Sequence, residues 1–307
     1  MPTPIVLDTD IGTDVDDAIA LALALASPEI DLCAVTVVSG DVQLRARIAG
    51  HLLHLAGRDA LPVAAGVREP ILRQRNFLWL GHEGRGIVEK DEPPPVSSLH
   101  AVDLLIDTVL RERPHVVAIG PLSNLAVAIM KTPEIIPAIA HLTVMGGALG
   151  GSDDPTVPSV EYNLTSDAEA ALVVLGAGIP TTLVPLDVTW HTFLTTADLD
   201  CLRTAASPLV QTVCDAIEIW WPVQRQFFAD TRSYRPDIVS FLHDPLALTS
   251  VFNRSFLRFE RRALRPVIVD DQLRFVEDPT ASPLEVAVDV DRVRFVDFLV
   301  DRLLAFV

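Results

Sequence analysis

Short aliphatic and β-branched runs alternate with helical patterns along the first 185 residues of the chain. The strand-like runs are Ile5–Leu7, Leu32–Val38, Val116–Ile119, Leu142–Met145 and Thr182–Pro185. The helical patterns cover Asp16–Ala26, Val42–Ala56, Leu122–Met130 and Ala168–Gly176. This alternation predicts an α/β fold with a mostly parallel, open sheet and helices on both faces. In such a sheet, the loops after the carboxyl ends of the strands form the binding crevice.

The rest of the chain departs from this alternation. Residues 67–98 have the composition of a long loop, which carries Trp79 and His82. Residues 195–252 are mostly helical in pattern, and the remainder indicates strands followed by a closing helix. We find no repeat, low-complexity tract or linker, and therefore expect a single domain over residues 1–307.

The charge balance excludes several kinds of partner. The chain has 24 Lys and Arg against 41 Asp and Glu, a formal net charge of −17. Without a basic stripe to neutralise phosphates, nucleic acid and anionic membranes are not expected partners. The longest apolar stretch, Ala18–Ala26, is too short to span a bilayer. Cys33, Cys201 and Cys214 form no CxxC pair, and we expect buried free thiols in a cytoplasmic protein whose start shows no signal-peptide pattern.

The joint between the first strand and the first helix is unusually acidic. It packs five aspartates into ten residues: Asp8, Asp10, Asp14, Asp16 and Asp17. A helix N-terminus offers about half a unit of positive charge, which accounts for one or two of them. Hard oxygen ligands without nearby Cys or His indicate calcium or magnesium. An EF-hand loop is excluded, because its sixth and twelfth positions hold Thr13 and Ile19 instead of Gly and Glu.

The segment DTDIGTDVDDAIAL resembles the aspartate motif DxDxGxDDAxAL of the inosine-uridine preferring nucleoside hydrolase family, with two extra residues after the glycine. Further segments resemble that family's motifs in the same order, namely AIGPLSNLAVAI, VMGGA, EYNLTSDAEAA (against the family's EFNxxxDPEAA), VPLDVT and FLHDPLAL. Together they extend from Asp8 to Ala247. The resemblance implies a nucleoside hydrolase-like fold with a Rossmann-like core, acting on ribonucleosides.

The resemblance also implies roles for individual residues. Asp10 would be both a calcium ligand and the general base that takes a proton from a metal-bound water. Asp17, Asp244 and the main-chain carbonyl of Ile119 would complete the Ca²⁺ coordination. His243 would face the base and protonate it as it leaves. These roles suit the chemistry, because the ribose develops positive charge when the N-glycosidic bond breaks and carboxylates stabilise that charge.

Other residues are expected to bind the substrate. Asp16 and Asn163 would hold the ribose hydroxyls, and Glu161 would reach toward the sugar's 5′ side. In the long loop, a lid over the substrate is one interpretation of Trp79 and His82, with core packing of Trp79 as the alternative. We also expect core packing for the aromatic residues at helical spacing, which are Trp220, Trp221, Phe227 and Phe228. The alternative that one of them stacks on the base of the substrate stays open.

Three departures from the family pattern bear on the sugar. Asp41 stands where the family commonly has a ribose-contacting asparagine, and Asp153, Asp154 and Pro155 replace a GN segment. The two-residue insertion could shift Asp14 into the site, and the role of Asp14 stays open. The preference for purine or pyrimidine nucleosides stays open as well. The resemblance implies a homodimer or homotetramer. We expect nucleotides to be poor substrates, because no Lys or Arg cradle for a phosphate is evident.

Two other functions are compatible with parts of the sequence. IVLDTDIGT also resembles the DxDxT motif of haloacid-dehalogenase-like phosphatases, in which Asp8 would be the nucleophile and Asp10 the acid, with magnesium. The phosphatase reaction gives no role to Asp14, Asp16 and Asp17. A non-catalytic, calcium-stabilised nucleoside-binding protein is the second alternative.

Overall fold

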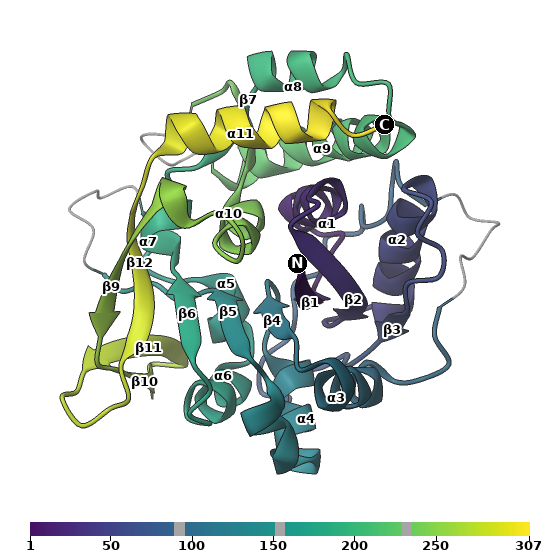
Figure 1. Ribbon diagram of the computed structural model, residues 1–307. Coiled ribbons are helices and arrows are strands. Elements are labelled where there is room, and N and C mark those ends of the chain that lie inside the picture. Colours follow the sequence, from purple (N-terminus) through teal and green to yellow (C-terminus); the bar gives the residue numbers. More distant parts are fainter. Residues whose placement is uncertain (89–95, 151–156, 229–234) are drawn as a thin grey trace.

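The structure is a computed structural model that describes residues 1–88, 96–150, 157–228 and 235–307 (Figure 1). Within these residues, twelve strands follow in chain order: β1 (Thr3–Thr9), β2 (Ile30–Val37), β3 (Val63–Ala65), β4 (His115–Ala118), β5 (His141–Met145), β6 (Thr181–Val184), β7 (Phe193–Thr195), β8 (Ile238–Phe241), β9 (Leu257–Arg262), β10 (Leu264–Val269), β11 (Gln272–Glu277) and β12 (Leu284–Val290).

Eight of these strands form the central sheet of the described chain, in the order β3-β2-β1-β4-β5-β6-β12-β9. Every neighbouring pair is parallel except the last, because β9 runs antiparallel to β12 at the edge. The order reverses beside β1, so that β2 and β4 lie on either side of it. A parallel sheet that reverses in this way opens a crevice at the carboxyl ends of its central strands.

The helices are α1 (Asp16–Ala26), α2 (Val42–Leu55), α3 (Ala101–Glu112), α4 (Ser123–Lys131), α5 (Tyr162–Ser166), α6 (Ala168–Leu175), α7 (Leu186–Thr189), α8 (Thr196–Leu202), α9 (Pro208–Phe227), α10 (His243–Thr249) and α11 (Arg292–Leu304), with 3₁₀ turns at Pro133–Ala138 and Arg254–Phe256. In Figure 1, α3, α4 and α6 cover one face of the sheet, whereas α1, α2, α10 and α11 lie over the other.

The two faces bury separate hydrophobic clusters. Along β1, Ile5 and Leu7 pack into the cluster that contains α1 and α11, while Val6 faces the cluster of α3 and α4. This alternation follows from the two-residue period of a strand. Both faces are therefore buried, and the centres of the two strands, Ile5–Leu7 in β1 and Leu32–Val35 in β2, are apolar without alternation.

The predicted fold class is confirmed: the sheet is mostly parallel and helices cover both of its faces. The helix predicted at Asp16–Ala26 has the same bounds in the structure, and the nine strands and helices predicted up to Pro185 match to within two residues. The prediction of mostly helix over 195–252 omitted β8, which pairs antiparallel with β7 outside the central sheet.

Two smaller expectations have different outcomes. Cys214 is buried, but Cys201 is exposed and Cys33 is half-buried, so the expectation of three buried thiols is wrong. Within the described residues, none of the helices combines the length and apolar character needed to cross a membrane.

Candidate active site

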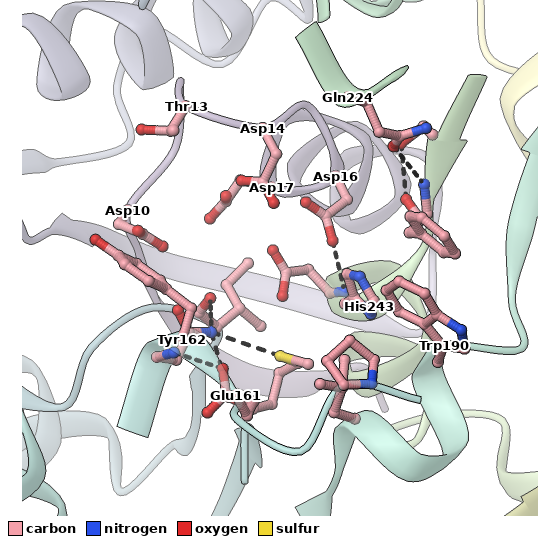
Figure 2. Close-up of a pocket in the computed structure, with 18 of the residues that line it drawn as sticks. Asp10, Thr13, Asp14, Asp16, Asp17, Glu161, Tyr162, Trp190, Gln224 and His243 are labelled. Carbon is pink, nitrogen blue, oxygen red and sulfur yellow. Dashed lines mark hydrogen bonds between the residues drawn. The ribbon is translucent and has the colours of Figure 1, made fainter. Parts of the chain in front are cut away.

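A cavity of about 310 Å³ opens at the carboxyl edge of the central strands. Its walls come from segments far apart in the chain: the loop after β1, Ile119 after β4, Met145 at the end of β5, and the starts of α5 and α10. Figure 2 shows carboxylates at one end of this pocket and Trp190, Gln224 and His243 at the other. The pocket therefore joins an acidic end to an aromatic end.

The acidic end gathers six predicted residues: Asp10, Asp14, Asp16, Asp17, Ile119 and Asp244. Carboxylate oxygens of Asp14, Asp16 and Asp17 lie within 4.8 Å of one another. Asp16 and Asp17 form the first turn of α1, while Asp244 arrives on α10, where its backbone N–H donates to Asp16 Oδ2 at 3.3 Å. Contact between α1 and α10 thus closes the cluster.

The carboxylates of this cluster are poorly compensated by the protein itself. Burial raises the pKa of Asp10 to about 7, although the positive charge of Arg45 opposes the shift. Burial and the negative charges of neighbouring aspartates hold the pKa values of Asp16, Asp17 and Asp244 well above their usual range. Buried, mutually repelling oxygen donors match the ligand preference of a hard divalent cation. The residues present therefore fit a metal site.

Arg45 is the buried cation behind this loop, with no exposed surface. Its guanidinium donates to the carbonyls of Ser39 and Ile11 at 2.7 and 2.8 Å, and to Thr13 Oγ1 at 2.9 Å. Its charge lowers the pKa values of Asp10, Asp14 and Asp17. Arg45 thus fixes the inserted loop from behind, and no sequence pattern had singled it out.

Asp8 lies behind the pocket and does not line it. It is fully buried and accepts hydrogen bonds from Thr36 Oγ1 and Asn124 Nδ2 at 2.5 and 2.8 Å. Burial raises its pKa to about 6. A buried side chain without access to the cavity cannot attack a phosphate ester, so the geometry disfavours the phosphatase alternative.

Asn163 and Glu161 approach the pocket from the start of α5. Asn163 Nδ2 donates to the Ile119 carbonyl at 3.0 Å, which orients that carbonyl at the acidic end. The Glu161 carboxylate is occupied by the backbone, because it accepts N–H groups of Gly147, Asn163 and Leu164 at 2.5 to 2.9 Å. Glu161 is therefore first of all the N-cap of a short helix.

His243 stands at the aromatic end. Its ring stacks on Phe241 with centroids 5.4 Å apart and lies 6.4 Å from the Trp190 ring. Nδ1 is 2.8 Å from Thr189 Oγ1, a partner that fixes the ring orientation. Burial lowers the pKa of His243 to about 4, so the imidazole of the metal-free chain is neutral at pH 7.

Three predicted substrate-binding residues do not line the cavity. Asp41 is exposed and caps α2, accepting the Leu44 N–H at 3.1 Å. Trp79 lies 5.4 Å from the Arg45 guanidinium and packs against Gly40, so it belongs neither to the pocket nor to the deep core. His82 stacks on Trp220 at 5.7 Å and its Nε2 is 2.6 Å from the Thr13 carbonyl, which places it beside the acidic loop.

Sequence reasoning missed several residues that line the pocket. Trp220, Phe227 and Phe228 were assigned to the core by default, yet all three contribute to the wall. Gln224 was not selected. Its Oε1 accepts the Trp220 indole N–H at 3.1 Å and so holds that ring at the pocket wall. The departures at Asp153, Asp154 and Pro155 lie outside the described residues.

The fold and the pocket define an α/β protein with an acidic crevice that fits a metal ion, beside an aromatic one. The family model of the inosine-uridine preferring nucleoside hydrolase matches residues 5–297. The chain therefore belongs to the nucleoside hydrolase family, and it is a nucleoside N-ribohydrolase.

Relatives and solved structures agree with this assignment. The chain is similar to the pyrimidine-specific ribonucleoside hydrolase RihA of Enterobacter sp. (strain 638), with 32% identity over 100% of this chain and 99% of the relative. RihA of Salmonella arizonae is 33% identical, with 99% of each chain covered. Among solved structures, a purine-preferring ribonucleoside hydrolase from Gardnerella vaginalis aligns with a TM-score of 0.85 at 26% identity over 99% of both chains. A plant nucleoside hydrolase aligns with a TM-score of 0.83 at 28% identity, over 99% of this chain and 100% of that one.

Proposed function

We propose that this nucleoside hydrolase is calcium-dependent and releases free base and ribose from ribonucleosides. The observation that carries the proposal is the pocket itself, in which buried carboxylates face aromatic rings across a space of nucleoside size. Asp10, Asp17, Asp244 and the Ile119 carbonyl would hold the cation, as oxygen ligands suited to Ca²⁺. When bound, the cation offsets the carboxylate charge and lowers the pKa of a water molecule.

The protein's own residues then account for the reaction. Water adds its oxygen to the anomeric carbon while the bond from that carbon to the base nitrogen breaks. Asp10 accepts the proton of the attacking water, because its carboxylate lies at the acidic end of the pocket, where the proposed site places that water. Asp16 and the amide oxygen of Asn163 accept hydrogen bonds from the ribose hydroxyls. The surrounding carboxylates stabilise the positive charge that develops on the sugar.

We place His243 at the leaving base. With Nδ1 turned to the Thr189 hydroxyl, Nε2 is the ring atom available to the pocket. Because burial keeps the imidazole neutral at pH 7, His243 assists departure by donating a hydrogen bond from Nε2–H, while the Thr189 hydroxyl donates to Nδ1; to act as the leaving-group acid it must first take up a proton and become imidazolium. Trp190 and Phe241 hold the ring in this orientation.

The pocket favours neutral substrates. None of the described residues that line it is Lys or Arg, and the donors of Arg45 face the loop behind it. A 5′-phosphate would enter the pocket without a Lys or Arg side chain to balance its charge. We therefore expect inosine to be hydrolysed and its 5′-monophosphate to be hydrolysed far more slowly.

A nucleoside panel tests the proposal. Inosine, uridine, cytidine, adenosine and inosine 5′-monophosphate are incubated with the enzyme in Ca²⁺ or in chelator, and free ribose is measured. We expect ribose release from nucleosides that is lost in chelator and restored by Ca²⁺. Asp10→Asn should abolish release, whereas the exposed Asp200→Asn should match wild type. Phosphate release from the nucleotide, or nucleoside binding without ribose release, would contradict the proposal.

We also propose that residues 1–307 form a single domain and that the enzyme is a homodimer or homotetramer. The family match over 5–297 supports the first point, and the family resemblance supports the second. Light scattering after size-exclusion chromatography measures the assembly directly, and a monomeric mass would contradict it.

A further inference from the structure

One residue of the GPLSN motif, Asn124, is fully buried but does not line the pocket. It lies in the first turn of α4, five positions after Ile119. Its amide oxygen Oδ1 accepts the Val67 N–H at 2.9 Å, while its amide nitrogen Nδ2 donates to Asp8 Oδ1 at 2.8 Å and to the Val37 carbonyl at 3.1 Å. Asn124 therefore joins the end of β1, the end of β2 and the start of the long loop.

These three partners require an asparagine at this position. The Val67 N–H needs an acceptor and the Val37 carbonyl needs a donor, and an amide supplies both within one short side chain. An ionised aspartate has no hydrogen to donate, and a leucine of similar size can neither donate nor accept. The surrounding backbone fits the amide closely, because a Cβ added at Gly66 would collide with Asn124 Oδ1 and lie 2.6 Å from the Val37 carbonyl oxygen. The approach of Asn124 to the backbone thus depends on a glycine at position 66.

The segments that carry two of the proposed calcium ligands are linked to each other twice. Ile119 follows β4 and Asp10 follows β1, and these two strands are neighbours in the sheet. The first link joins the backbones, because the Ile119 N–H donates to the Asp8 carbonyl at 2.8 Å. The second link is the hydrogen bond from Asn124 Nδ2 to the Asp8 carboxylate. A shift of the Ile119 carbonyl relative to Asp10 would therefore stretch or break at least one of these bonds.

The same two segments also pack without spare room. A Cβ added at Gly120 would lie 2.8 Å from the Asp10 backbone nitrogen and 2.9 Å from Asp10 Oδ1. In such close packing, a displaced start of α4 would move the Gly120 backbone against Asp10. On the other side, Asn163 Nδ2 donates to the Ile119 carbonyl at 3.0 Å. The geometry of the acidic end thus depends on where α4 begins, and Asn124 bonds this helix to β1.

We propose that Asn124 is a positioning residue for the metal site: it fixes the Ile119 carbonyl relative to the Asp10 carboxylate and thereby supports Ca²⁺ binding without contacting the ion or the substrate. This inference rests on the proposed function, which names those two groups as ligands. Replacing a residue that orients metal ligands from behind typically weakens metal binding by about 10- to 100-fold. Because the same amide accepts the Val67 N–H, the metal site and the start of the long loop share one anchor.

The test is Asn124→Leu, because leucine is similar in size and makes none of the three hydrogen bonds. The matched control is Ser123→Ala in the same helix turn. Ser123 is equally buried, but its hydroxyl donates to Asp167 Oδ2 at the start of α6, at 2.5 Å. The Ca²⁺ affinity of chelator-treated protein is measured by isothermal titration calorimetry. We expect Asn124→Leu to bind Ca²⁺ about 10- to 100-fold more weakly than wild type, and Ser123→Ala to stay within about twofold of it.

The control separates positioning from a general loss of stability, because both variants remove buried hydrogen bonds and both should unfold at lower urea than wild type. If Asn124→Leu binds Ca²⁺ as tightly as wild type, or if Ser123→Ala loses as much affinity, Asn124 does not position the ligands, although the enzyme remains a nucleoside hydrolase. If Asn124→Leu does not fold, Asn124→Ala takes its place, since the smaller side chain leaves room for water at the lost contacts, and the same weakening is expected. If wild type itself binds no Ca²⁺, the proposed calcium site is wrong and this inference fails with it.

Discussion

Replacing Asp17 by asparagine is expected to stabilise the metal-free protein, although Asp17 is a proposed metal ligand. The carboxylate is buried, and burial together with the charges of Asp10 and Asp14 holds its pKa well above the usual range. A charged Asp17 therefore costs free energy in the absence of a cation. Asparagine removes the charge and retains an oxygen that can accept the Thr9 hydroxyl, as Asp17 Oδ1 does.

The size of the effect follows from the spacing of the carboxylates. Two unit charges 4.8 Å apart repel by about 3.5 kcal/mol at an effective dielectric constant of about 20. Part of that cost is avoided because members of the cluster take up protons, so we expect a net gain of about 1–2 kcal/mol at pH 8. A raised carboxylate pKa means that the cost is present at high pH and vanishes below the unfolded-state value. The gain should accordingly shrink toward pH 5.

The assay is thermal or urea unfolding in chelator and in Ca²⁺. Wild type is expected to gain about 2.7 kcal/mol when free Ca²⁺ is about 100 times its dissociation constant, whereas Asp17→Asn should gain little. Each kcal/mol of unfolding free energy corresponds to a shift of about 2–4 °C in Tm for domains of about 150–250 residues, and the shift is at the lower end for a longer chain such as this one. Asp200→Asn, an exposed carboxylate, is the control. If Asp17→Asn melts below wild type in chelator, mutual repulsion does not govern the acidic end.

Three further predictions concern other parts of the structure. Arg45→Met removes three hydrogen bonds of a buried guanidinium and should lower the free energy of unfolding, measured in urea, by about 2–4 kcal/mol. Arg45→Lys should have a stability between those of Arg45→Met and wild type, and unchanged stability would contradict the anchoring role. Burial lowers the pKa of His115 to about 3, so on acidification the unfolded chain binds a proton at this histidine before the folded chain does, and stability falls below about pH 6.5. His115→Gln should recover about 2 kcal/mol of the stability that wild type loses between pH 7 and pH 5. Parallel stability–pH profiles of variant and wild type would refute this. Trp190→Ala removes the ring stacked 4.4 Å from Phe241 and should raise KM by about tenfold or more, so an unaltered KM would place the base elsewhere.

Much of the acidic end was predictable from the sequence. Asp10, Asp16 and Asp17 flank a strand-to-helix joint, and the topology of a parallel sheet brings such joints to one edge. The HDP motif placed Asp244 with them only through the family resemblance, because no local rule predicts that α10 packs on α1. Within the described residues the structure brings all the proposed metal ligands to one pocket.

The aromatic end and the supporting residues were not predictable in the same way. Trp220 and Phe228 follow a helical period that a buried core and a pocket wall share, so periodicity cannot separate the two. Asp41 was predicted to contact the sugar from its position after β2, but its carboxylate accepts the Leu44 N–H and caps α2. Arg45 gave no signal, because its partners Ser39, Ile11 and Thr13 meet it only in the folded chain.

The contact between α1 and α10 orders events during synthesis of the chain. Asp10, Asp16 and Asp17 leave the ribosome early, whereas Asp244 follows 228 positions after Asp16 and reaches them through α10. Until that helix emerges, a nascent chain presents clustered acids with an incomplete set of ligands. With Asp244 as a ligand, as we propose, firm capture of the ion would wait until more than three quarters of the polypeptide exists, so metal uptake would be a late step of maturation instead of a nucleus for folding.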